Sequence, residues 1–181
     1  MYWEADAQMN DIELVGKIKE LGLFYLSEAA LFSLSEQVKN VNELNGIFIE
    51  TGCALGSSAI VIANSMKKGE KLYLYDVFEM IPPPSDKDGE DIQQRYKTIK
   101  SGKSRGIGDN KYYGYVENLI DEIKVNFNSC GVSLENVHFI KGLYENTLNA
   151  NPQLKSNLND IGNNQASQSN TRKDERNKTI S

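Results

Sequence analysis

At 181 residues and a net charge of −5, the chain has the length of one ordinary domain and no basic stripe, which disfavours nucleic acid and acidic membranes as partners. It has no apolar run near the roughly 18 residues of a membrane span, and its acidic start is unlike a signal peptide. Two cysteines without CxxC spacing, Cys53 and Cys130, indicate reduced, buried thiols in a cytoplasmic protein.

Two amphipathic helices are expected in the first region, residues 1–45. Apolar residues recur at helical spacing over 11–22 and again over 27–41. Ser27 is a good N-cap for the second helix. We expect both helices to cover one side of a sheet.

Residues 46–58, GIFIETGCALGSS, are the most informative part of the chain. A short apolar strand over 47–51 runs into a turn with two glycines, and then into an apolar helix over 57–66 that Lys67, Lys68 and Gly69 would end. The run KLYLYD, residues 71–76, predicts a second strand. Together they predict a right-handed βαβ unit of a nucleotide-type α/β fold.

Residues 79–111 hold all but one of the prolines and many charges, and we interpret them as an irregular lid. A helix is expected over 112–130, ended by Gly131, followed by a third strand over 137–141. The sheet region therefore spans 46–150. The polar tail, residues 151–181, is predicted to be disordered beyond one weak helical turn.

The glycine loop departs from the G-x-G-x-x-G pattern of dinucleotide sites, because it reads Glu50-x-Gly52-x-x-x-Gly56. A carboxylate there repels phosphate and suits a ligand with an ammonium or other cationic centre. S-adenosylmethionine carries an ammonium, a sulfonium and no phosphate, and its carboxylate suits the helix start at Ser57 and Ser58. The alternative is a plain tight turn.

Asp76 ends the second strand, where an acid commonly accepts both ribose hydroxyls of an adenosine ligand; the alternative is a simple turn former. The only histidine, His138, is expected to be structural. The acidic cluster over 86–91 lacks calcium-loop spacing and is expected to be a solvated loop. The tyrosines over 112–115 can line a substrate mouth, with at least one of them in the core.

Three runs in order resemble the class I S-adenosylmethionine-dependent O-methyltransferases of the macrocin and mycinamicin type, which methylate sugar hydroxyls on natural products. The runs are ETGCALGSS, DVFEMIPPPSDKDGE and FIKGLYENTL, and the likeness spans residues 26–148. The resemblance implies a Rossmann-like sheet, S-adenosylmethionine as cofactor and a small hydroxyl-bearing acceptor. The expected cofactor-binding residues are Glu50, Thr51, Gly52, Gly56, Ser57, Ser58, Asp76 and Phe78.

The chain departs from this family at two places. Met80 stands where a small glycine is usual. After Leu148 there is no counterpart of the family's fourth and fifth strands, whose acids hold magnesium and place the acceptor hydroxyl. We therefore expect an incomplete sheet of about three parallel strands, no metal site and no assignable catalytic residue.

Three readings of that departure stay open. The chain is a truncated methyltransferase that retains the cofactor half of its site, a fragment or split-enzyme subunit completed by a partner chain or by self-association, or a non-enzymatic binding module on a nucleotide-fold scaffold. The first reading is preferred. The exposed edge of the first strand favours association in all of them.

Overall fold

The computed structural model describes residues 8–41, 44, 46–106 and 110–148, in two compact units that divide after Leu143. The second unit contributes one short helix, α6 (Tyr144–Thr147), to the described residues. The expected disorder over 151–181 lies outside them. Among the helices described, none is long and apolar enough to cross a membrane.

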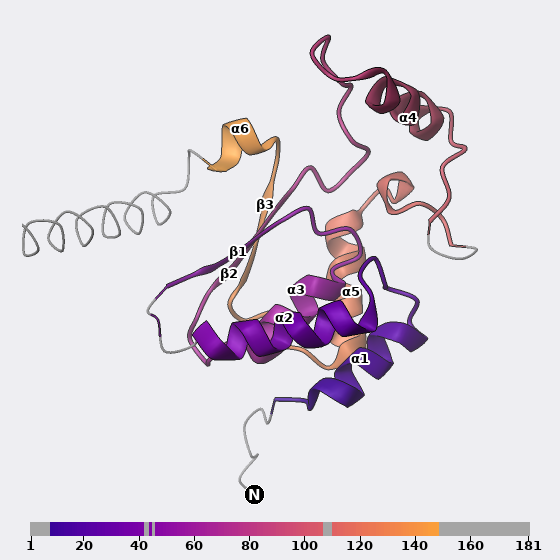
Figure 1. The fold of residues 1–181 in the computed structure, drawn as a ribbon. Coiled ribbons are helices and arrows are strands. Elements are labelled where there is room, and N and C mark those ends of the chain that lie inside the picture. The colour runs from indigo at the N-terminus through magenta and orange to yellow at the C-terminus, as the bar shows by residue number, and fades with distance from the viewer. Residues whose placement is uncertain (1–7, 42–43, 45, 107–109, 149–181) are drawn as a thin grey trace, which may run out of the picture. The chain divides into compact units, whose positions relative to one another are not determined.

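The first unit is built on a parallel sheet with the strand order β1-β2-β3 (Figure 1). Its strands are β1 (Phe48–Thr51), β2 (Leu72–Asp76) and β3 (Val137–Lys141), which confirms the three expected strands and the α/β class. The first two each begin one residue later than expected. Because the strands are parallel, their carboxyl ends lie at one edge of the sheet, and the loops that leave this edge are neighbours.

The first two helices form as their sequence patterns predict. They are α1 (Asp11–Glu20) and α2 (Glu28–Val41). The Asn10 side chain accepts the Glu13 N–H at 3.0 Å, and Ser27 Oγ accepts the Ala30 N–H at 3.2 Å, so each first turn has a side-chain cap and the expected Ser27 cap is confirmed.

The helix after β1, α3 (Ser57–Ser65), ends earlier than expected. Met66 is already extended, with ψ 153°, and its N–H reaches the Ile62 carbonyl. The predicted ending at Lys67–Gly69 is therefore wrong. The Lys67 N–H instead donates to the Glu70 carboxylate at 2.7 Å, which stabilises a separate turn before β2.

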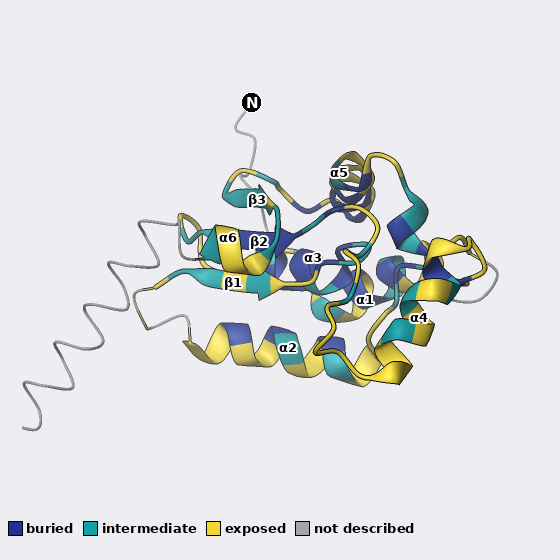
Figure 2. Ribbon diagram, turned by 90° about the horizontal axis from the view of Figure 1, so that it is seen from above, coloured by how far each residue is buried: buried dark blue, intermediate teal, exposed yellow. Residues whose placement is uncertain are grey.

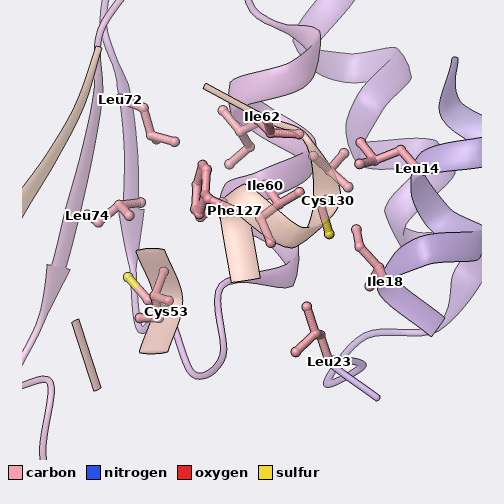
Figure 3. Close-up of a cluster of buried hydrophobic side chains, with 14 of the residues drawn as sticks. Leu14, Ile18, Leu23, Cys53, Ile60, Ile62, Leu72, Leu74, Phe127 and Cys130 are labelled. Atoms are coloured by element: carbon pink, nitrogen blue, oxygen red, sulfur yellow. The ribbon is translucent and has the colours of Figure 1, made fainter. Parts of the chain in front are cut away.

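The main core lies between one face of the sheet and the helices α1, α2, α3 and α5 (Leu119–Cys130). Figure 3 shows Leu72 and Leu74 of β2 on the sheet side, with Ile60 and Phe127 from two different helices packed toward them. Each of these four side chains is fully buried. Burial of a side chain of this size contributes about 1.5–3 kcal/mol, so these contacts fix α3 and α5 on the sheet.

The opposite face of the sheet also carries aromatic side chains. Tyr73 of β2 pairs in register with His138 of β3, and their rings stack with centroids 4.8 Å apart. Ile49 of β1 pairs with Tyr73 in the same row and is 38% exposed. His138 thus lies within β3 and stacks on the neighbouring strand, as expected of a structural residue.

Two sequence expectations for the segment between β2 and α5 are wrong. The lid is not wholly irregular, because it contains the helix α4 (Glu90–Lys100), which has a single buried residue, Ile99. The following helix does not begin at Tyr112: residues 113–115 form a 3-10 turn, η1, and α5 begins at Leu119. Figure 2 shows α4 as largely exposed, in contrast to α3. Gly131 ends α5 in the left-handed region, as predicted.

Candidate functional site

The residues that the sequence singles out gather at the carboxyl edge of the sheet. Glu50 and Thr51 end β1, the loop over 52–56 follows, and Ser57 and Ser58 begin α3. Asp76 ends β2, and Phe78 follows two residues later. Thr51 is exposed, whereas Ser57, Asp76 and Phe78 are buried.

The glycine loop needs its two glycines. Gly52 and Gly56 have φ angles of 85° and 87°, in the left-handed region that side chains disfavour. A Cβ on Gly56 would lie 2.8 Å from Cγ2 of Ile123, so this position also allows α5 to approach. Asn126 of α5 donates to the Leu55 carbonyl at 3.0 Å. Helix packing and one buried hydrogen bond therefore define the path of the loop.

Asp76 joins this loop to the end of β2. Its Oδ2 accepts the Cys53 N–H at 2.7 Å, and its Oδ1 accepts the Phe78 N–H at 2.9 Å. Ala54 and Phe78 both have positive φ angles, 44° and 50°, which cost about 1–3 kcal/mol each for non-glycine residues. The Asp76 carboxylate holds the chain in these conformations on both sides of the site.

Glu50 is the least satisfied polar group at this edge. Its Oε1 accepts a hydrogen bond from the Ser58 hydroxyl, while its Oε2 is buried without a hydrogen-bond partner among the described residues. Burial raises the pKa of Glu50 to about 7; the Ser58 hydrogen bond lowers it, and the charge of Asp76 raises it further. This oxygen is suited to receive a cationic or hydrogen-bond-donating ligand.

A cluster of tyrosines stands beside Asp76. The centroid of the Tyr113 ring lies 5.3 Å from that of Tyr25, in an edge-on arrangement, and 4.6 Å from that of Tyr112. The centroids of the Tyr112 and Tyr115 rings are 5.2 Å apart. Burial raises the pKa of the Tyr113 phenol above its usual range, a hydrogen bond with Tyr112 adds to this, and the charges of neighbours that include Asp76 contribute. Tyr112 is buried, which confirms that one of these tyrosines packs in the core.

The same cluster anchors the base of the lid. The Tyr115 hydroxyl donates to the Ile99 carbonyl at the end of α4 and accepts the Ser104 N–H at 3.1 Å. Elsewhere the lid is held mainly by its own exposed contacts, such as the Ser85–Asp88 turn. The Tyr115 phenol is thus one attachment of the lid to the rest of the unit, beside the buried Ile99 and the exposed Glu79–Lys141 ion pair.

Other candidate groups carry no comparable site. Cys53 and Cys130 are free and buried, and burial raises the pKa of both thiols. Among the described residues, no three His, Cys, Asp or Glu side chains gather in a way that could hold a metal ion. The acidic residues over 86–91 are exposed, as expected, but Glu90 and Asp91 form the first turn of α4 and not a loop.

Sequence reasoning missed two contributors to the site. Asn126 holds the glycine loop, and Tyr25, in the connection between α1 and α2, packs its ring edge-on against the Tyr113 ring and accepts a hydrogen bond from the Tyr113 backbone. For Asn126 a signal was present, since it is a polar residue on the buried face of α5, beside Ile123 and Phe127. Tyr25 lies outside every predicted helix and strand, and no sequence pattern indicated a role for it in the site.

Comparisons with known proteins found a family and solved structures that are similar to this chain. The family model for macrocin O-methyltransferase (TylF) matches residues 27–161. The solved structure of the O-methyltransferase NovP matches 68% of this chain and 48% of its own, with 20% sequence identity and a TM-score of 0.53. For the calicheamicin methyltransferase CalS11 these shares are 79% and 55%, at 13% identity and a TM-score of 0.47.

The similarity to NovP is one of fold. The chain spans about half the length of each of these two structures. A search of curated proteins found no match.

Proposed function

Since the chain belongs to the macrocin O-methyltransferase (TylF) family, we propose that it binds S-adenosylmethionine at the carboxyl edge of its sheet and serves methyl transfer to a hydroxyl of a small molecule, a sugar or natural product. The observation that carries the proposal is the buried, unpartnered Oε2 of Glu50 beside the glycine loop. A ligand with positive charge satisfies this oxygen, whereas a phosphate would be repelled by both Glu50 and Asp76.

Each polar group of the ligand is assigned to a different part of this edge of the sheet. Gly56 caps α3 without a side chain, so the backbone N–H groups of the first turn can donate hydrogen bonds to the ligand's carboxylate. The ligand's ammonium is assigned to Glu50. Asp76 is assigned to the ribose hydroxyls, because each of its oxygens keeps a second lone pair after accepting one backbone N–H. Thr51, Gly52, Ser57 and Phe78 line the same edge.

The cofactor supplies an electrophilic methyl group on a cationic sulfur. Transfer to an oxygen is an in-line displacement and needs an acceptor held close, with its proton removed. The lid over 79–111 and the tyrosines near Asp76 are placed to exclude water from this edge. The base that removes the acceptor proton is not assigned to any residue.

We also propose that the outer edge of β1 is a site of association with a second polypeptide, either a partner chain or another copy. Among the described strands β1 pairs only with β2, and its Ile49 is partly exposed. Light scattering of the purified chain and of Ile49→Lys tests this. We expect an assembly that the lysine weakens; a monomer in both cases contradicts it.

A location in the cytoplasm is proposed as well, supported by the two free cysteines.

The first experiment is a thermal melt with and without S-adenosylmethionine, and with ATP as a phosphate-bearing control that shares its adenosine. Ligand at 100 times its dissociation constant stabilises a protein by about 2.7 kcal/mol, so we expect a clear rise in Tm with the first ligand only. No shift with S-adenosylmethionine at any concentration, or an equal shift with ATP, contradicts the proposed function.

A further inference from the structure

Few groups around Glu50 can stabilise a negative charge on its carboxylate. From α3 it has the Ser58 hydroxyl; from β2 it faces the Asp76 carboxylate, and the Cys53 thiol is close in the glycine loop. Within the described residues no lysine, arginine or histidine pairs with it. One of its oxygens is buried without a hydrogen bond.

A carboxylate in such a place is stabilised most simply by taking up a proton. An unpaired buried charge is costly, and a neighbouring like charge adds to the cost. Asp76 does not share this problem, because two backbone N–H groups donate to it. Of the two acids at this edge, Glu50 is therefore the one that holds a proton most readily.

We propose that Glu50 is substantially protonated in the free protein near neutral pH, and that binding of the cationic cofactor drives this proton into solvent. The inference rests on the proposed function, because it concerns the same ligand. The exchange is balanced: a neutral carboxyl and a cation become an ion pair and a hydrated proton. Cofactor binding is then coupled to pH through one named residue.

The coupling has a predictable size. Only the ionised fraction of Glu50 is competent to pair with a cation, and apparent affinity is reduced by that fraction. With the pKa of Glu50 at about 7, that fraction rises about tenfold from pH 6 to pH 8. We expect the dissociation constant for S-adenosylmethionine to fall by about the same factor, beyond any change due to the ligand's own amine.

Isothermal titration calorimetry with S-adenosylmethionine, in pairs of buffers with different ionisation enthalpies, measures the protons released. At pH 7 we expect about half a proton to be released from Glu50 in the wild type. Glu50→Gln lacks this component and keeps whatever the ligand releases. Glu122→Gln is the matched control, since Glu122 is exposed on α5 and should behave as the wild type.

A second measurement covers the case in which Glu50→Gln binds too weakly to titrate. In the free wild type, the carboxyl carbon resonance of Glu50, identified by its absence in the Gln variant, should titrate near pH 7. Binding with equal proton release in wild type and Glu50→Gln, or titration of this resonance near the ordinary glutamate value, overturns the inference and leaves the proposed function standing. No binding by the wild type at any pH overturns both.

Discussion

The segments that follow β1 and β2 leave the same edge of the sheet and are held in opposite ways. The loop over 52–56 is short, buries Cys53 and Gly56, and is fixed by one hydrogen bond that Asp76 accepts and one that Asn126 donates. The lid over 79–111 is long and mostly exposed, with α4 set apart from the sheet in Figure 1. The floor of the site, the loop over 52–56, is thus held by the sheet and α5, whereas its cover, the lid, is held by a few contacts at its two ends, and damage to the two should have different consequences.

The largest effect is expected from Gly56→Ala. A left-handed alanine costs about 1–2 kcal/mol and the close contact with Ile123 about 1–3 kcal/mol, so stability should fall by about 2–5 kcal/mol. Gly16→Ala in α1, where a Cβ meets nothing within 4 Å, should stabilise by about 0.5–1 kcal/mol. Urea denaturation measures both. Equal effects of the two substitutions would contradict the tight packing at Gly56.

Glu50→Gln should change how stability depends on pH. Because the folded-state pKa is raised from 4.5 to about 7, the contribution of Glu50 is fully present below pH 4.5 and is lost as pH rises through 7. We expect the wild type to lose about 2–3 kcal/mol more than Glu50→Gln between pH 4.5 and pH 8. Denaturation curves across this range measure the difference; parallel curves would show that Glu50 is not desolvated.

Asp76→Asn should loosen both loops at once. The amide can accept from only one of the Cys53 and Phe78 N–H groups, and the other loses its acceptor. A loss of about 1–3 kcal/mol is expected. Asp86→Asn, an exposed lid acid, should change stability by less than about 0.5 kcal/mol. A matching small effect at Asp76 would mean that its two hydrogen bonds do not hold the floor.

The smallest effect on stability is expected from Tyr115→Phe. It removes the hydroxyl that joins Ile99 and Ser104, at a cost of about 0.5–1.5 kcal/mol. Amide hydrogen exchange should accelerate over 99–104 and stay unchanged in the loop over 52–56. If exchange rises equally in both segments, the lid and the floor are one cooperative unit and the contrast drawn above fails.

Sequence patterns predicted the glycine loop and its flanking elements better than the lid over 79–111, for a physical reason. β2 buries every residue and α3 nearly every one, so apolar runs and flanking glycines mark them clearly. In α4 only Ile99 is buried, so local propensity forms that helix without an apolar stripe. The apolar spacing over 112–130 predicted that α5 begins at Tyr112. Residues 113–115 instead form η1, in which Gly114 is buried and the Tyr113 ring packs against that of Tyr112.

The site residues were predictable as a list but not as a network. Glu50, Gly56 and Asp76 stand out by type and by place in a βαβ pattern. That Asp76 accepts the Cys53 N–H, or that Asn126 reaches the Leu55 carbonyl 71 positions away, depends on how α5 packs, and no local pattern contains it.

The strand order of the sheet has a consequence for biosynthesis. Since β1, β2 and β3 lie side by side in the order in which they are translated, each new strand finds its neighbour already synthesised. The pairing of β1 with β2 closes the shorter loop, which favours its early formation, whereas β3 pairs with β2 across the long lid segment. The three strands can therefore assemble one after another as the nascent chain leaves the ribosome, with α3 covering the first pair before α5 emerges.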